Sequence, residues 1–419
     1  MAKKIFILGV AIIMALGLAV GLAGCNTFDL EQYKADAKAE LDSYAQANYR
    51  EENWTAIQNI VANTKTSIDG ATSKVQIDKI VVAAKEAIDK VEAERIKPMD
   101  GAEEYSSGNG TENAPYIIGT KGQLIHFSNQ INSGKNTNAY FILSADIDLD
   151  GMEWVPAGII TASYNGGNCF YGVFDGKGYE VSNFCITARQ KNTRAENIGL
   201  FGYNAGTIRN LGAVDFDIDI SWSYEFGYGW SVMSGGLAGS NFGNIANCFA
   251  IGNINLAYQG GATITSPSHI FAGGLVGNNG NNGSITNCYT AVEVNAEYSN
   301  EAGTTSAGGL AGATNGTIEN CLVTGNVSIS CHSSGTGTAG ALFGEITGAT
   351  KQNCYWYEGL LVNGATSNVL DVICSALELN NPTFYTGKLS WNIDDWDFDD
   401  LNFSDGKFID GKYPKLIQK

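Results

Sequence analysis

Positively charged residues are scarce in this sequence and are missing from its middle. The 419 residues include 25 Lys and Arg against 43 Asp and Glu, so the formal net charge is −18. No Lys or Arg occurs between Arg209 and Lys351. An acidic surface of this kind repels nucleic acid, anionic membranes and anionic polymers. It also argues against a polyuronate lyase, which needs cations to neutralise the carboxylates of its substrate.

Histidine is nearly absent as well, and the few histidines form no catalytic motif. His126, His269 and His332 are the only three, and none of them stands in an HExxH pattern. No GxSxG elbow is present, and the nine cysteines lack the CxxC or Cys/His spacing of a zinc site. We therefore assign no catalytic residue, no metal and no cofactor, and favour a protein that is not an enzyme.

One enzymatic alternative stays open, a glycosidase that uses carboxylates. Asp215, Asp217 and Asp219 alternate along a predicted strand and would share its outward face. The apolar residues between them fit a plain strand with polar side chains outside equally well. Residues 145–151, ADIDLDG, imitate the start of a calcium loop, but the apolar Ile147 and Leu149 indicate a strand there too.

Residues 1–24 have the pattern of an export signal, with two lysines, an apolar run and small residues before Cys25. The sequence LAGC resembles the lipobox of bacterial lipoproteins. The resemblance implies cleavage before Cys25 and a lipid on its thiol, so we expect a protein that is anchored to the bacterial cell membrane and exposed outside the cytoplasm. A plain membrane helix is the alternative, although the apolar run is short for one.

Residues 25–97 have helical periodicity and predict a small three-helix bundle. Apolar residues recur at intervals of three and four, and Gly70 and Ser73 mark the end of one helix and the start of the next. The segment is similar to the three-helix modules of many bacterial surface proteins, which implies a stalk; a partner-binding bundle is the alternative. Residues 98–110, rich in Gly, Ser and acidic residues, predict a linker.

The whole chain contains 52 glycines but only six prolines, and beyond the linker a repeat appears. Copies begin at Gly199, Gly235, Gly273, Gly308 and Gly340, for example GGLVGNNGNNGSITNCYT and GGLAGATNGTIENCL. Each copy has short strands separated by Gly/Asn turns and no helical pattern. The copies recur every 32–38 residues and contain strands alone. This pattern predicts stacked coils that form a parallel β-helix over residues 111–360.

These copies resemble the GLUG motif, named for its Gly-Leu-x-Gly core, over residues 199–357. The segments GTENAPYII and FYGVFDGKGYEVSNF further upstream are similar to the usual first coils of proteins that carry the motif. The resemblance implies a right-handed β-solenoid on a secreted or surface protein and does not imply one activity. The fold class that we predict is therefore mainly β, a right-handed parallel β-helix preceded by the small helical bundle.

Stacking of parallel coils about 4.8 Å apart places equal positions of the repeat on top of one another. The leucines of the copies should then fill the core. Five asparagines that recur once per copy should form a ladder, because Asn tolerates a positive φ at a corner and can bond to the coils above and below: Asn210, Asn247, Asn287, Asn320 and Asn353. Four of these are followed by cysteines, which we expect to be stacked, buried free thiols: Cys248, Cys288, Cys321 and Cys354.

Two further segments lie outside the repeat pattern. Residues 361–419, rich in Trp, Phe and Asp, predict a C-terminal cap over the last coil. The stretch SWSYEFGYGWS has aromatics at every second position and predicts an insertion between coils: Trp222, Tyr224, Phe226, Tyr228 and Trp230. This row either covers the solenoid wall or forms a platform that binds neutral sugars or a protein.

The leading functional hypothesis is a non-catalytic surface lipoprotein whose inter-coil loops bind a glycan or a protein, as an adhesin does. Its partners would be the membrane, through the lipid, and a neutral glycan or a cell-surface protein. The carbohydrate-active enzyme and a structural component of the cell envelope are the alternatives.

Overall fold

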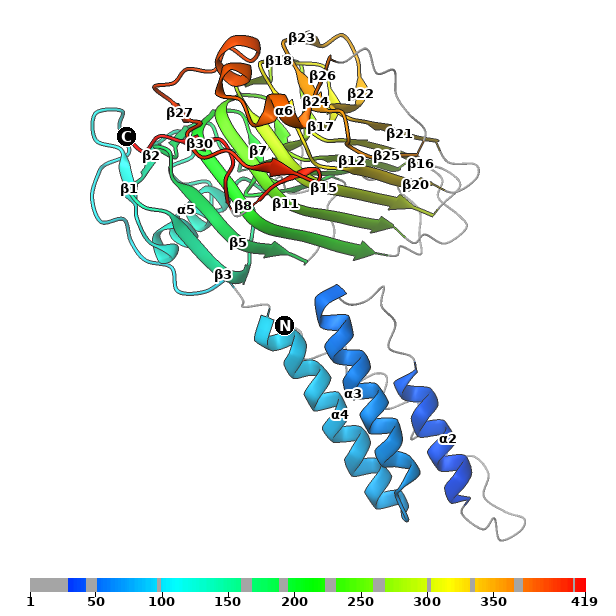
Figure 1. Cartoon of the computed structure of the whole chain (residues 1–419). Helices are drawn as coiled ribbons and strands as arrows, with labels where there is room; N and C mark the ends of the chain where they lie inside the picture. The colour runs from blue at the N-terminus through cyan, green and yellow to red at the C-terminus, as the bar shows by residue number, and fades with distance from the viewer. Residues whose placement is uncertain are drawn as a thin grey trace. The chain divides into compact units, whose positions relative to one another are not determined.

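The computed structural model describes residues 29–42, 51–95, 99–159, 168–187, 195–222, 231–258, 268–299, 303–331, 336–364, 372–409 and 411–419. Cys25 and the predicted signal lie outside these ranges. The chain divides into two compact units, residues 1–91 and 92–419 (Figure 1).

The first unit contains helices α2 (Leu30–Leu41), α3 (Glu51–Asp69) and α4 (Lys74–Arg95). Their apolar faces share one core, which includes Leu41, Ile68 and Ile77. Side chains cap two of the helices: the Asp29 carboxylate accepts hydrogen bonds at the start of α2, and Ser73 Oγ accepts one from Gln76 N at the start of α4. Within the described residues, no helix has both the length and the apolar composition that a membrane span requires.

The second unit is a solenoid of parallel strands, so the predicted fold class, a mainly β solenoid after N-terminal helices, is confirmed. Each turn adds one short strand to each of two five-stranded sheets and a longer segment to a third sheet of sixteen strands. The first five-stranded sheet consists of β6 (Ala195–Ile198), β9 (Ser231–Gly235), β12 (Ser268–Gly273), β16 (Gly303–Gly308) and β21 (Thr336–Gly340). The second consists of β7 (Phe201–Asn204), β10 (Ala238–Asn241), β13 (Val276–Asn279), β17 (Ala311–Thr314) and β22 (Phe343–Ile346).

The sixteen-stranded sheet is called the large sheet here. Its first strands are β1 (Tyr116–Ile118), β2 (Tyr140–Leu143), β3 (Ile147–Glu153), β4 (Val173–Asp175), β5 (Glu180–Ile186) and the long β8 (Thr207–Trp222). The next are β11 (Asn244–Tyr258), β14 (Ser284–Thr286), β15 (Tyr289–Tyr298), β18 (Thr317–Glu319), β19 (Leu322–Val323) and β20 (Val327–Cys331). The last are β23 (Thr350–Gln352), β24 (Tyr355–Tyr357), β25 (Val362–Asn363) and β26 (Val372–Cys374).

The core repeats from coil to coil because the copies stack in register. Leu237, Leu275, Leu310 and Leu342 are completely buried, and the backbone N–H of each of the first three donates to the carbonyl of the next at 2.9–3.0 Å. Ile208, Ile245, Ile285 and Ile318 form a second buried stack. Lys351 takes the Ile position in the last coil, and partial burial lowers the pKa of its ammonium group. The stack of buried isoleucines therefore ends at Ile318, one coil before the last repeat.

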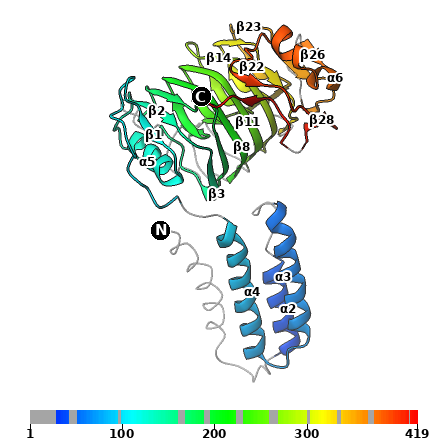
Figure 2. The same ribbon diagram turned by 60° about the vertical axis from the view of Figure 1, so that its left-hand side comes forward.

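A helix that the repeat pattern does not predict covers the first coils. Helix α5 (Lys121–Asn132) buries Leu124, Phe127 and Ile131 and lies beside β1 and β2 at the start of the solenoid (Figure 2). The ring of Phe127 packs edge-on against Phe141 with ring centres 4.8 Å apart. Apolar end strands are thereby hidden from solvent, as solenoid ends require.

The structure places two predicted segments differently. In the predicted linker, residues 98–110, the side chains of Met99 and Tyr105 pack against the solenoid core. The C-terminal segment follows β26, which adds a strand to the last coil, and then turns back along the outside of the large sheet (Figures 1 and 2). It is therefore a lateral strap rather than a cap over the end alone.

The strap, residues 376–419, covers a stripe of outward apolar side chains on the large sheet. It contains α6 (Ala376–Leu379), a π-helical turn at Phe384–Lys388 and the short strands β27 (Trp396–Asp397), β28 (Phe403–Ser404), β29 (Lys407–Phe408) and β30 (Lys415–Leu416). Its aromatic side chains pack on Val214, Phe249, Tyr289 and Leu322, which come from successive coils. Burial of these apolar surfaces is the physical reason for the lateral course.

Candidate ligand-binding face

Most of the predicted aromatic row lies outside the described residues, namely Tyr224, Phe226, Tyr228 and Trp230. Trp222 belongs by its backbone to the end of β8, where it pairs with Tyr258 of β11, and not to an insertion. Strand β8 bends at Asn210 and bulges at Asp215, and both residues have positive φ. Tyr258 of β11 is also the register partner of Tyr298 of β15. Both tyrosines are buried, and their rings stack with centres 4.9 Å apart.

The five recurring asparagines form a hydrogen-bonded ladder at the corner that precedes the strap-covered part of the large sheet. All five have φ between 50° and 54°. Each amide Nδ2 donates to the Oδ1 of the preceding coil: Asn247 to Asn210 (3.2 Å), Asn287 to Asn247 (3.1 Å), Asn320 to Asn287 (3.0 Å) and Asn353 to Asn320 (3.1 Å). Asn210 donates in turn to Asp175 Oδ1 (2.9 Å), which extends the ladder by one coil.

A second ladder, which the sequence reasoning missed, lies at the corner after the β7 sheet. Asn204 Nδ2 donates to Asn241 Oδ1 at 2.7 Å, and Asn241 Nδ2 donates to Asn279 Oδ1 at 2.8 Å. All three side chains are completely buried. The sequence feature that could have indicated this ladder is the asparagine at the end of each short strand, as in GYNAG and GSNFG. An asparagine beside glycines is also common in ordinary turns, so it does not stand out.

The four cysteines after the first ladder point inward and are buried free thiols in the structure. The backbone N–H of Cys248 donates to Cys288 Sγ at 3.4 Å, so neighbouring coils bring the sulfur atoms close together. Burial raises the pKa of the Cys288 thiol, and the hydrogen bond with Cys321 raises that of Cys354. All four thiols are therefore buried groups of the solenoid core.

The second half of the large sheet carries an exposed array of polar side chains, which we call the polar face. Along β8, β11, β15 and β20 the inward positions are apolar and buried, for example Ile218, Ile254 and Val294. The outward positions alternate with these and are polar except for one alanine: Asp217, Asp219, Ser221, Asn253, Asn255, Ala257, Glu293, Asn295, Glu297, Asn326, Ser328 and Ser330.

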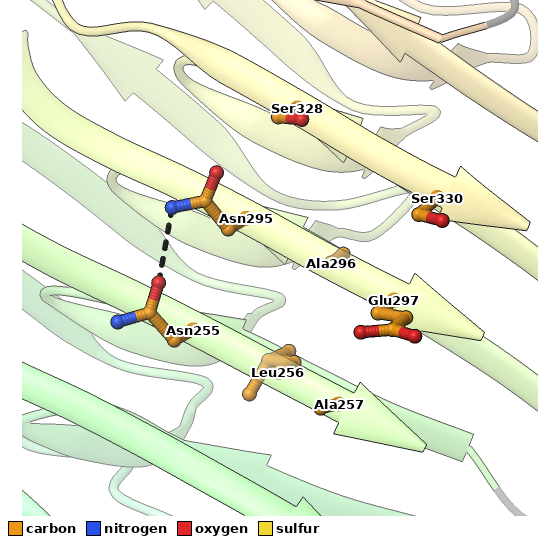
Figure 3. A pocket seen from close by; sticks show the side chains of 8 residues that line it. All are labelled: Asn255, Leu256, Ala257, Asn295, Ala296, Glu297, Ser328 and Ser330. Atoms are coloured by element: carbon orange, nitrogen blue, oxygen red, sulfur yellow. Dashed lines mark hydrogen bonds between the residues drawn. The ribbon is translucent and has the colours of Figure 1, made fainter. Parts of the chain in front are cut away.

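Strand register arranges the polar face in rows that cross the strands. The central row runs Asp219, Asn255, Asn295, Ser328, Asn363. Asn295 Nδ2 donates to Asn255 Oδ1 at 3.0 Å, which orients both amides (Figure 3). One row further along the strands are Ser221, Ala257, Glu297 and Ser330.

A shallow hollow of about 300 Å³ opens on this face. Its lining comes from three successive coils: Asn255, Leu256, Ala257, Asn295, Ala296, Glu297, Ser328 and Ser330. The small side chains of Ala257, Ser328 and Ser330 leave the space, and the Glu297 side chain projects beside it (Figure 3). The hollow thus offers amide donors, hydroxyls and a carboxylate to a ligand.

The carboxylates proposed for a glycosidase do not form one uniform row. Asp217 and Asp219 face outward on β8, whereas Asp215 sits at the bulge with φ 52°. Burial raises the pKa of Glu180 on β5, and the Asp146 and Asp215 carboxylates act in the same direction. The hydrogen bond from Tyr413 Oη (3.0 Å) and the charge of Lys415 oppose this shift. The hydrogen bond between Tyr413 and Glu180 joins the strap to β5.

Comparisons with known proteins find relatives that match only a short part of the chain. A protein named as a Gly-rich membrane protein of Evansella cellulosilytica is 32% identical over 151 residues, which is 34% of this chain and 15% of that protein. Halomucin of Haloquadratum walsbyi is 35% identical over 115 residues, 25% of this chain and 1% of halomucin. The chain thus spans only a small part of these relatives. No family model and no solved structure matches the chain.

Proposed function

We propose that this chain is a non-catalytic cell-surface lipoprotein with GLUG-type repeats that binds a neutral glycan on the polar face. The observation that carries the proposal is the exposed array of oriented amide, hydroxyl and carboxylate groups across several coils. Such groups match the hydroxyls of a sugar, each of which both donates and accepts hydrogen bonds. The segment 223–230 follows the array directly in the sequence, so its aromatics are candidates for additional stacking contacts.

The proposed location rests on the sequence and on the relatives. The relatives are named as a membrane protein and as halomucin, names that fit a protein at the cell surface. Cys25 would carry the lipid, and the helical unit would be the stalk. Two acyl chains on such a residue would give a firm anchor, whereas one gives only marginal binding.

Neutrality of the glycan follows from charge. The polar face contains Asp217, Asp219, Glu293 and Glu297, and the sequence from 210 to 350 contains no Lys or Arg. An anionic polymer such as a polyuronate would be repelled. A neutral polymer can use the carboxylates as hydrogen-bond acceptors.

The test is a glycan-binding screen with a matched pair of variants. The unmodified protein should bind at least one neutral glycan, and the double variant Asn255→Ala/Asn295→Ala should bind it at least tenfold more weakly. Asn244→Ala is the control, because Asn244 is an exposed asparagine on the same strand, away from the polar face. Equal affinity of the double variant and the control would overturn the proposal.

A further inference from the structure

We infer that the glycan is an extended linear chain that lies along the solenoid axis, across the strands, with about one sugar per coil. This inference rests on the proposed function and adds the shape and direction of the ligand. It follows from the register of the large sheet, the place of the hollow on that sheet and the hydrogen-bonding groups of the central row.

The central row repeats with the period of the coils. Asp219, Asn255, Asn295, Ser328 and Asn363 are register partners on five successive strands. Successive strands are about 4.8 Å apart, so the row extends over about 19 Å. One sugar ring of an extended chain is about as long as one step of the row, so the accumulated offset between rings and side chains stays small over a few units.

Along a strand, the spacing of the outward side chains does not match the length of a sugar ring. Outward positions along β11 are about 6.7 Å apart and change in character from Asn253 through Asn255 to Ala257. Across the strands, the central row keeps a hydrogen-bonding side chain on every coil. A ligand with a regular repeat therefore gains contacts at each step only when it crosses the strands.

The hollow lies on the central row and on the row beside it. Its residues come from three coils, with Asn255–Ala257 on β11, Asn295–Glu297 on β15 and Ser328 with Ser330 on β20. A ligand in the hollow therefore contacts three coils of the central row. Glu297 lies in the neighbouring row and can accept hydrogen bonds from hydroxyls of a chain that lies in the central row (Figure 3).

A peptide or a protein fits this face less well. The backbone groups of β11 and β15 are bonded within the sheet, so an extended peptide has no strand edge here to join. Protein interfaces also depend on apolar or aromatic anchors, and among the outward residues of the polar face only Ala257 is apolar. The side chains present are hydrogen-bonding groups for a hydroxyl-rich ligand.

Titration calorimetry with the full chain and a length series tests the inference. The probes are neutral linear oligomers of glucose, mannose, galactose and N-acetylglucosamine, from one to about eight units. For the oligomer type that binds, affinity should rise several-fold with each unit up to about five units, the number of coils in the row, and then level off. Asn295→Ala, in the middle of the row, should end the rise after about two units, while Asn244→Ala should leave the curve unchanged.

The outcomes separate the two claims. Binding that is lost in the double variant but does not depend on chain length would overturn the axial arrangement and leave the proposed function standing. No binding of any oligomer would overturn the proposed function itself. Binding of basic peptides in place of sugars, with a steep loss of affinity as salt is added, would also overturn it, because it would identify a cationic partner.

Discussion

At the residue scale, one repeated asparagine shapes the same corner in each of five successive coils. Asn287 has φ 53°, donates to the coil before it and accepts from the coil after it. Asn is suited to both demands, because it visits the left-handed region more readily than other non-glycine residues and its amide has donors and an acceptor. The ladder therefore links conformation and stacking in a single side chain.

We predict that Asn287→Ala destabilises the solenoid by about 3 kcal/mol, from two lost hydrogen bonds and a strained backbone. Asn287→Gly loses the bonds without the strain and should be destabilised by about 1 kcal/mol less. Urea unfolding followed by Trp fluorescence measures both, since six of the seven tryptophans lie in residues 92–419. Equal stability of the Ala variant and the unmodified protein would contradict the role of the ladder.

Glu180 gives a prediction on pH. Because burial raises its pKa in the folded state, its contribution to stability is fully present below the unfolded pKa of about 4.3 and is lost as pH rises through the folded value. Glu180→Gln, which can still accept from Tyr413, should therefore melt at a higher temperature than the unmodified protein at pH 7. The difference should vanish at pH 4, and a difference that is constant with pH would exclude titration of Glu180 as its cause.

The sequence allowed one asparagine ladder to be predicted and concealed the other. Asn210 and its equivalents precede cysteines at a fixed place in each copy, so their alignment follows from the repeat alone. Asn204, Asn241 and Asn279 stand in Gly-rich turns, where an asparagine is common for local reasons. Only the tertiary structure shows that these three side chains point inward.

At the element scale, the strap is held by its aromatic side chains. Trp391 and Trp396 stack with ring centres 4.5 Å apart, and Trp391 Nε1 donates to Asn320 O at 2.8 Å. Tyr289 Oη donates to Pro414 O at 3.0 Å from the sheet side. These contacts join the strap to several coils at once.

We predict that Trp396→Ala, which empties a completely buried site, costs about 3–5 kcal/mol and loosens the strap from the sheet. Limited proteolysis should then cut within residues 376–419 faster than in the unmodified protein. Ile393→Ala is the control, because Ile393 is 66% exposed. Slow cleavage of both variants would show that the strap does not depend on this cluster.

Elements outside the repeat were the hardest to predict from the sequence. Helix α5 has Leu124, Phe127 and Ile131 at helical spacing and Thr120 as its cap, signals that a search for strands overlooks. The aromatic residues of the strap indicated that it packs on another part of the chain. Its position along the large sheet depends on outward residues such as Phe249 and Tyr289. Those residues are apolar on a face that the alternation rule assigns to solvent.

At the scale of the solenoid unit, the function rests on register. A shift of one residue between coils would turn the polar side chains of the large sheet inward and the apolar ones outward. The fold class could be predicted because a repeat fixes this register. Outward carboxylates on β8 could be predicted from alternation, but the extent of the polar face could not, because it depends on where the strap ends and leaves the sheet exposed.

Disulfide trapping between coils measures the register directly. In the double variant Asn255→Cys/Asn295→Cys the two Cα atoms would be about 4.8 Å apart, within the range that a disulfide bridges. Mild oxidation should link them rapidly, which mass spectrometry of the joined peptides detects. Asn255→Cys/Glu297→Cys, a diagonal pair about 8 Å apart, should link slowly or not at all. Preferential linking of the diagonal pair would contradict the rows on which the proposed binding face depends.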